Sequence, residues 1–366
     1  MIKHLTCTII LITVSLSMTA QVNNHVNNIV DSISLYGKFS VHGAVFKNKL
    51  EFQENAPKLG VIIHRRINPN TRVCGVLEYR YHIINGTEFN NDAATPADFI
   101  NHPFEEIEAF VSRLAYVGVN HKKLGSITYG KQWGVYFDIA SYTDRYTVFG
   151  GGAMGVYAVG TDGGWKGTGR ADKSLIYRNS LGDFKLGMQS QLFGDYVNYG
   201  LSLQYQRNKL KFGLGYNCAQ IQKEFRVYFR DIGNAITNII AGAQYVNKKY
   251  NIGLTAAFND DEFTRLSEDK VVSFSALGIE LFSSYRPSTR FEIQGGFNYM
   301  IDNNKNKLYD GKYRLFHLIG GLNYYLDRNT FFYTSFRLDN SNLFVGAKTN
   351  SVFLIGFTYN FTKLLD

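Results

Sequence analysis

Apolar and polar residues alternate along most of the chain with a period of two. In residues 33–45, Phe39 and Val41 fall on one face, whereas Lys38 and His42 fall on the other. Successive side chains of a β-strand point to opposite faces, so this alternation predicts strands. Runs with the same pattern predict sixteen strands, near residues 33–45, 58–67, 71–83, 109–119, 125–136, 169–180, 183–193, 199–206, 209–218, 236–246, 249–258, 271–284, 289–299, 313–326, 329–338 and 351–361. Most of these runs are close to the ~9–11 residues that a tilted strand needs to cross a membrane.

The connections between these strands are alternately short and long. Tight turns are predicted near residues 68–70, 121–124, 181–183, 207–208, 247–249, 286–289 and 327–329. The other connections are mostly longer, at 46–57, 84–107, 137–168, 219–235, 259–270, 300–312 and 339–350, with a short one at 194–198. Barrels of the bacterial outer membrane have short turns at the periplasmic end and longer loops at the outer end. The alternation therefore predicts a transmembrane antiparallel β-barrel with both ends of the chain on the periplasmic side.

The last predicted strand, 351–361, favours a membrane barrel over a secreted soluble β-protein such as a lectin or adhesin. Its large apolar residues all share one face: Phe353, Ile355, Phe357, Tyr359 and Phe361. On a soluble edge strand, such a face would invite aggregation, whereas it suits contact with lipid. Residues 362–366 extend past this strand.

The connection 137–168 is unusually long for a segment without strand or helix periodicity. Loops of this length in compact folds are usually functional. Because it joins two predicted neighbouring strands, we expect it to fold into the lumen and to set the size and charge of a pore.

Composition agrees with a barrel and excludes other classes. The chain has 366 residues, of which 25 are tyrosine, 28 phenylalanine and 35 glycine, and its mean hydropathy is −0.17. It is too aromatic for a disordered chain and, beyond its first twenty residues, has no long apolar run for a membrane helix. The formal net charge of +9 is spread over strands and turns, which favours attraction of anions over binding of nucleic acid.

Residues 1–20 have the features of a secretory signal peptide. A short basic start with Lys3 precedes an apolar core and the small residues Thr19 and Ala20. We predict cleavage after Ala20 and a single barrel domain over residues 21–366. Cys74 and Cys218, the cysteines of that domain, show no disulfide-framework spacing and are expected to be free thiols.

The segment from about residue 31 to 180 resembles the general porins of Gram-negative outer membranes. The matching residues, in order along the chain, are Leu35-Tyr-Gly-Lys38, Arg113-Leu-Ala-Tyr-Val-Gly118, Gly125-Ser-Ile-Thr-Tyr-Gly-Lys-Gln-Trp-Gly134, Tyr142-Thr-Asp144, Phe149-Gly150-Gly151 and Tyr177-Arg-Asn-Ser180. The resemblance implies a trimer of 16-stranded barrels whose third loop folds inward. It also implies passive diffusion of small hydrophilic solutes and ions through a water-filled channel, without a catalysed reaction.

In that family, basic residues on the barrel wall face acidic residues on the inward loop. The resemblance assigns Lys38, Lys58, Arg113 and Arg170 to the basic wall, and strand alternation independently supports the first three. It assigns Asp144 to the acidic side. The family's usual second acid is replaced by Val148, and Arg145 directly follows Asp144. The predicted constriction therefore comprises Lys38, Lys58, Arg113, Asp144, Arg145 and Arg170, and it should prefer anions.

Two other functions are alternatives for a barrel of this kind. A substrate-selective channel for a sugar or an anion would use aromatic residues along its path, and the loop and its approach contain Tyr136, Phe137, Tyr142, Tyr146, Phe149 and Tyr157. An outer-membrane hydrolase would need a nucleophile paired with a histidine, and no such spacing is present.

The sequence predicts no cofactor and no metal site, since His42, His64 and His82 lie on different predicted strands. The expected partners are outer-membrane lipid, lipopolysaccharide, two further copies of the chain, and small hydrophilic solutes and ions.

Overall fold

The computed structural model describes residues 30–84, 108–157, 163–221, 234–267, 270–303, 313–342 and 351–365. Their strands form one antiparallel sheet that closes on itself, and sixteen of the strands make up the barrel wall. The wall strands are β1 (Ser32–Phe46), β3 (Lys58–Asn68), β4 (Thr71–Tyr81), β5 (Phe110–His121), β6 (Gly125–Trp133), β7 (Arg170–Leu181), β8 (Phe184–Leu192), β9 (Val197–Arg207), β10 (Leu210–Gln220), β11 (Ala235–Val246), β12 (Tyr250–Ser267), β13 (Lys270–Tyr285), β14 (Phe291–Asp302), β15 (Arg314–Tyr325), β16 (Thr330–Asp339) and β17 (Val352–Leu365). The predicted 16-stranded barrel is confirmed.

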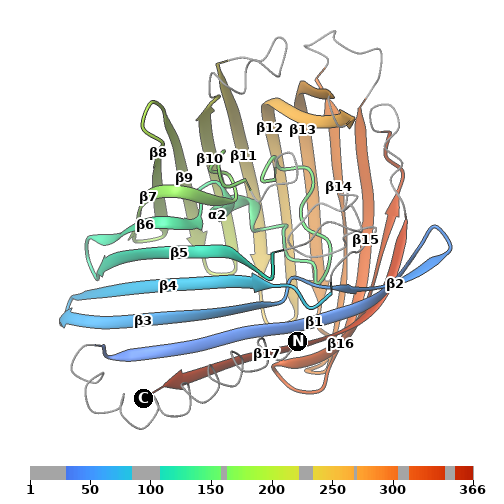
Figure 1. Ribbon diagram of the computed structural model, residues 1–366, viewed down its shortest axis with the longest axis horizontal. Coiled ribbons are helices and arrows are strands. Elements are labelled where there is room, and N and C mark those ends of the chain that lie inside the picture. Colours follow the sequence, from blue (N-terminus) through green and yellow to red (C-terminus); the bar gives the residue numbers. More distant parts are fainter. Residues whose placement is uncertain are drawn as a thin grey trace, which may run out of the picture.

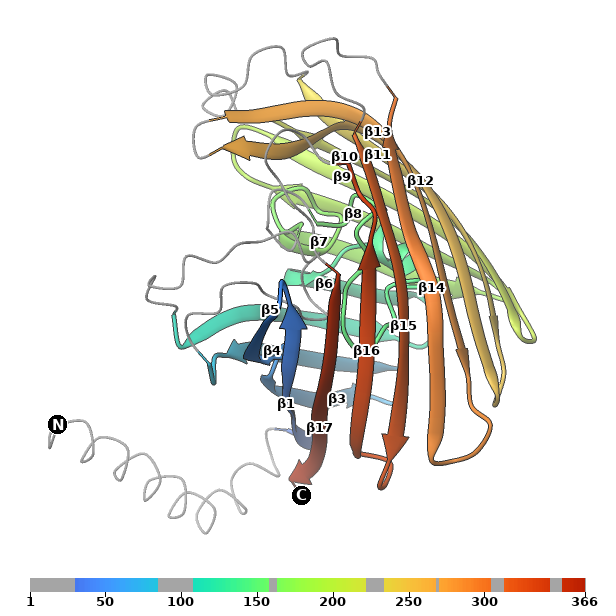
Figure 2. The same ribbon diagram turned by 90° about the vertical axis from the view of Figure 1, so that its right-hand side faces the viewer.

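The barrel closes where the first wall strand meets the last. The pairing of β1 with β17 runs from Ile33 opposite Leu365 to Val45 opposite Phe353. On its other edge β1 pairs with β3, where Lys38 lies opposite Lys58. In Figure 1 the strands on opposite walls cross, and in Figure 2 β1 lies beside β17. Among the described residues, each of the sixteen wall strands pairs with a neighbour on both sides, so closure leaves no wall strand as an open edge on which another chain could add.

Short turns join consecutive strands at one end of the barrel, which also holds the start of β1 and the end of β17. Left-handed backbone occurs in these turns at Asn208 (φ 55°) and Gly182 (φ 59°). Such residues match the turn to the twist of the flanking strands. The predicted signal peptide and nearly all of the predicted loop 84–107 lie outside the described residues.

Two connections differ from the expected loops. Within 46–57 the chain forms a further short strand, β2 (Lys49–Glu54), which pairs with the outer part of β1. Near 259–270 the wall strands β12 and β13 continue as a pair to Ser267 and Lys270 instead of ending in a loop. The last strand also continues to Leu365, because residues beyond Phe361 pair with β1.

The two faces of the wall differ as the alternation predicts. On β4, Leu77 and Tyr79 are 49% and 40% exposed on the outside, whereas Glu78 between them is 3% exposed and points inward. An outward apolar band is what a lipid-facing barrel requires. No helix of the described residues is long and apolar enough to span a membrane.

The hydrophobic core lies inside the barrel, between the long loop and one side of the inner wall. The loop includes one short helix, α2 (Phe137–Ala140), which packs against β9–β11 (Figure 1). A first cluster buries loop residues against β11–β15, among them Tyr136, Ile139, Tyr142, Met154, Ile240, Phe274 and Leu315. A second cluster buries Tyr146, Val148 and Phe149 against Ala44, Phe46, Phe282, Ile319, Tyr333, Val352 and Leu354. The inward fold of the loop is confirmed, and the wall beneath it is apolar where a simple polar-inside rule predicts polar residues.

Candidate pore constriction

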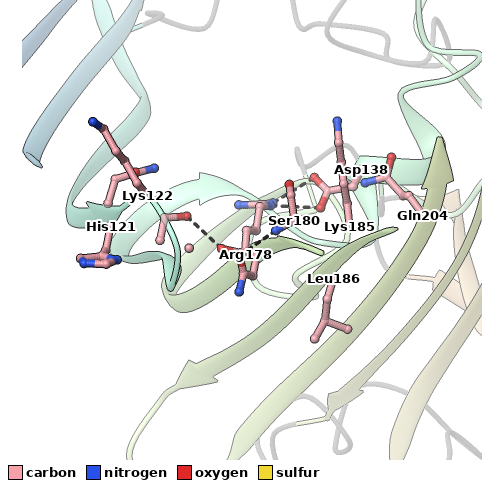
Figure 3. A pocket seen from close by; sticks show the side chains of 12 residues that line it. His121, Lys122, Asp138, Arg178, Ser180, Lys185, Leu186 and Gln204 are labelled. Atoms are coloured by element: carbon pink, nitrogen blue, oxygen red, sulfur yellow. Dashed lines mark hydrogen bonds and ion pairs between the residues drawn. The ribbon is translucent and has the colours of Figure 1, made fainter. Parts of the chain in front are cut away.

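The long loop begins with a charged anchor to the wall. In α2, the Asp138 carboxylate accepts hydrogen bonds from Nε and Nη2 of Arg178, both at 3.0 Å (Figure 3). The same guanidinium donates from Nη2 to the carbonyl of Trp133 at 2.9 Å. Burial raises the pKa of Asp138 above its ordinary value, and the neighbouring Arg178 acts against that shift. The bidentate pair fixes the direction in which the loop leaves β6.

A single wall carboxylate then holds the loop at two points. Glu280 of β13 is 1% exposed and faces the lumen. Its Oε1 accepts a hydrogen bond from the backbone N–H of Ala153 at 2.8 Å, and its Oε2 accepts one from the hydroxyl of Thr143 at 2.8 Å. Because the two donors are ten positions apart, Glu280 connects both limbs of the loop to one strand.

Glycines of the inner wall allow the loop backbone to lie directly against the strands. A Cβ atom added to Gly278 would collide with the carbonyl oxygen of Ala153. A Cβ added to Gly253 would collide with the carbonyl oxygen of Tyr142. Any other residue at these two positions would push the loop toward the pore axis, so the glycines help to determine the pore's width.

The predicted loop acid, Asp144, is held by the loop itself. Its Oδ1 accepts from the backbone N–H of Gly151 and its Oδ2 from the hydroxyl of Tyr157, both at 3.1 Å. Burial raises the pKa of Asp144, and these two hydrogen bonds oppose the shift. The neighbouring Arg145 is exposed, and its Nε donates to the carbonyl of Ser141 at 2.9 Å.

Two of the predicted wall cations meet at a carboxylate that the sequence analysis did not include in the site. Glu78 accepts from Lys58 Nζ at 2.9 Å and from Arg113 Nε at 2.8 Å. The hydroxyl of Tyr36 donates to the same carboxylate at 3.0 Å. Glu78 thus holds cations from β3 and β5 side by side on the wall. Its inward position followed from alternation, but its partners depend on the stagger between strands.

Arg170 and Arg113 lie near the loop's aromatic end. Arg170 is 6% exposed, and its guanidinium carbon is 5.2 Å from the ring centroid of Trp133. The charges of Arg170 and Arg113 both lower the pKa of the Tyr157 hydroxyl, which burial and Asp144 raise well above its usual value. The charges of both arginines therefore act on the Tyr157 hydroxyl, and the charge of Arg170 also acts against the raised pKa of Asp144.

Three predicted residues line one cavity of about 460 Å³. Lys38 and Lys58, which are direct cross-strand neighbours, lie on one side, and Arg145 of the loop also lines the cavity. The cavity also includes Arg286 and Tyr325, which border the short turns. It therefore extends from these predicted constriction residues toward the turn end of the lumen.

A second acid missed by sequence reasoning extends the charged wall. Glu54, at the end of β2, accepts from Arg80 Nη2 at 3.0 Å and lies 2.6 Å from Nδ1 of His82. The backbone N–H of Ile83 also donates to it at 2.7 Å. Because the residues of β2 are predicted as part of a loop, no pattern in the sequence indicates that Glu54 lies inside the barrel.

Most aromatic residues of the loop are packed against the wall. Tyr136, Tyr142 and Phe149 are at most 2% exposed, and Tyr146 and Tyr157 are 7% and 9% exposed. The adjacent Val148 is fully buried in the second cluster, where an apolar side chain is suited and a carboxylate would be costly.

Comparisons with known proteins agree with this architecture. The sequence model of the family described as "Gram-negative porin" matches residues 8–365. Outer membrane porin F of Salmonella typhimurium is 35% identical over 102 residues, which cover 28% of this chain and 24% of that protein. The chain thus aligns with only about a quarter of that relative's length. Outer membrane porin PhoE of Klebsiella pneumoniae is 23% identical over 272 residues, covering 68% of this chain and 73% of the other.

Solved structures show the same fold. Salmonella typhi OmpF in complex with daunomycin superimposes with a TM-score of 0.73 at 19% identity, covering 90% of this chain and 97% of that one. A trimer form of OmpT, an outer membrane protein of Vibrio cholerae, gives a TM-score of 0.65 at 16% identity, covering 90% and 99%. With a family match over nearly its whole length and a closed 16-stranded barrel, the chain belongs to the Gram-negative porins of the outer membrane.

Proposed function

We propose that the chain forms a water-filled diffusion channel for small hydrophilic solutes and ions that prefers anions. Loop 137–168 limits the size and charge of what passes. The channel carries out no reaction. Its functional unit is a homotrimer embedded in outer-membrane lipid and lipopolysaccharide, as the lipid-suited outer face and the family membership support.

The observation that carries the proposal is an excess of cations around the lumen. Among the described residues, the charged side chains near the constriction include Lys38, Lys58, Arg80, Arg113, Arg145, Arg170, Glu54, Glu78, Asp144 and Glu280. Six of these are basic and four are acidic. Inside a narrow pore such charges are screened less than in bulk water, so the excess favours anions along the path.

The loop is suited to be a fixed constriction. It is connected to the wall through Asp138, Thr143 and Ala153, and its apolar side chains are buried against the same wall. A loop held this way narrows the lumen without closing it on the side of the basic residues.

Planar-bilayer recording tests the proposal. Purified protein is inserted, a potassium chloride gradient is imposed, and the reversal potential is measured. We expect stepwise openings in groups of three and a reversal potential of the sign that chloride preference gives. A cation-preferring reversal potential would refute the charge argument, and a folded barrel that never conducts would refute the channel.

The loop's aromatic residues do not favour an aromatic sugar path through the constriction. Tyr136, Tyr142 and Phe149 are too buried to contact a passing solute. A selective channel of this architecture would need its solute contacts elsewhere in the lumen.

A further inference from the structure

The cavity of about 460 Å³ extends from the predicted constriction toward the turn end of the lumen. Its lining brings together basic side chains from three parts of the barrel: Lys38, Lys58, Arg145 and Arg286. Among the described residues that line it, Glu292 is the only acidic one. The volume is within the roughly 300–1,000 Å³ typical of small-molecule sites.

The lone carboxylate of this cavity is already engaged. Glu292 Oε2 accepts from Arg286 Nη2 at 3.1 Å and from the hydroxyl of Tyr325 at 2.7 Å. By contrast, Arg145 is exposed, and no carboxylate of the described chain lies within ion-pair distance of it. Its planar guanidinium is suited to bidentate recognition of a phosphate or carboxylate group.

Aromatic rings form another part of the same cavity. The Arg286 guanidinium carbon lies 5.6 Å from the centroid of the Tyr325 ring, whose centroid is 5.0 Å from that of Phe331. Phe331 and Tyr325 are partly exposed, unlike the buried aromatics of the loop. Flat rings beside hydrogen-bonding amides such as Asn251 and Asn360 suit a ligand with an apolar face and a rim of hydroxyl groups.

A second cavity, of about 350 Å³, provides an internal comparison (Figure 3). It also lies at the turn end and is lined by His121, Lys122, Arg178 and Lys185, with Asp138 beside them. None of the described residues that line it is a tyrosine, phenylalanine or tryptophan. Positive charge is thus common to both cavities, whereas the aromatic wall belongs to one.

We propose that the larger cavity is a subsite that retains anionic monosaccharides, meaning a sugar ring that carries a phosphate or carboxylate group. Arg145 and Lys38 hold the anionic group, and Tyr325 and Phe331 contact the ring. The inference rests on the proposed channel function and deepens it by naming a solute class.

Single-channel recording with glucose 6-phosphate as the probe tests this subsite, with glucose and inorganic phosphate as controls. We expect brief, reversible current blocks with glucose 6-phosphate at concentrations where neither control blocks. Arg145→Gln should raise the half-blocking concentration by about tenfold or more, as loss of a charge-assisted hydrogen bond does. Phe331→Leu should weaken the block without changing the reversal potential. Lys185→Gln, in the smaller cavity, should leave the block unchanged.

Calorimetric titration of the folded protein in detergent with the same three probes gives a second readout that does not require conduction. Binding of glucose 6-phosphate at least about tenfold tighter than that of inorganic phosphate would support the subsite, because the ring must add affinity. Equal binding of the two would overturn the subsite even if the channel conducts and prefers anions. Absence of conductance together with tight binding of glucose 6-phosphate would overturn the channel and leave the subsite standing.

Discussion

The close approach between Gly278 and the loop leads to a prediction whose size can be worked out. Gly278→Ala places a methyl group where the carbonyl oxygen of Ala153 now lies, so the loop must move locally. Such overpacking costs about 1–3 kcal/mol. If the shift also breaks the Ala153 N–H bond to Glu280, an unsatisfied buried donor adds about 1–3 kcal/mol.

The free energy of burial that keeps the loop docked is larger than these costs. Tyr136, Ile139, Tyr142 and Met154 are each at most 2% exposed. Burying one such side chain contributes about 1.5–3 kcal/mol, so these four contribute roughly 6–12 kcal/mol. The loop should therefore stay docked in Gly278→Ala, with a local displacement toward the pore.

The assay combines single-channel conductance with denaturant unfolding in lipid vesicles. We expect a changed conductance and a free energy of unfolding lower by about 1–3 kcal/mol, or by about 2–6 kcal/mol if the Ala153–Glu280 hydrogen bond is lost. Gly75→Ala is the matched control, since no heavy atom lies within 4 Å of the added Cβ. It should leave conductance unchanged and stabilise the chain by at most about 1 kcal/mol. If Gly278→Ala behaves like this control, the close approach is wrong; if its loop is released and cut by protease, the burial estimate is wrong.

Three further predictions concern the charges. Glu78→Gln leaves Arg113 buried without its carboxylate, so the free energy of unfolding should fall by about 3–5 kcal/mol. Anion preference in bilayers should increase, and unchanged selectivity would contradict a contribution of Glu78 to the electrostatic field in the pore. Asp144 has a folded pKa above the ~3.9 of an unfolded aspartate, so the folded state holds its proton more tightly. The stability that this group contributes should therefore be fully present below pH 4 and should decrease as pH rises through the folded pKa. Asp144→Asn should remove this trend from pH-dependent unfolding curves. An identical pH slope in the variant would refute the assignment. Arg145→Glu should shift the reversal potential toward cations, whereas an unaltered value would place Arg145 outside the ion path.

The sequence predicted the parts of the fold that depend on near neighbours in the chain. Alternation alone identified the outward face of Leu77 and Tyr79 and the inward face of Glu78, because a strand has a period of two. The short turns indicated which consecutive strands pair, and the number of alternating runs indicated how many strands there are. The sequence could not predict contacts across the lumen. Nothing near Glu280 in the chain indicates that it would contact Thr143 and Ala153, which are more than a hundred residues away.

The candidate site was predictable to a similar extent. Strand alternation placed Lys38, Lys58 and Arg113 on the inner face, and the family resemblance brought them into one constriction, which stays a prediction. Alternation could not predict the stagger between strands that brings Lys58 and Arg113 to the carboxylate of Glu78. It also could not show that Asp144 would hydrogen-bond within its own loop.

The second buried cluster links the loop to the place where the barrel closes. Val148 and Phe149 of the loop are buried in the same cluster as Phe46 of β1 and Leu354 of β17, the two strands that form the closing pair. Pairing of these strands joins segments about three hundred residues apart, which carries a large loop-closure entropy cost and forms slowly. A docked loop stabilises that junction from inside, so the constriction and the integrity of the barrel are thermodynamically coupled. Substitutions chosen to widen the pore at Val148 or Phe149 should therefore also weaken the closure of the barrel.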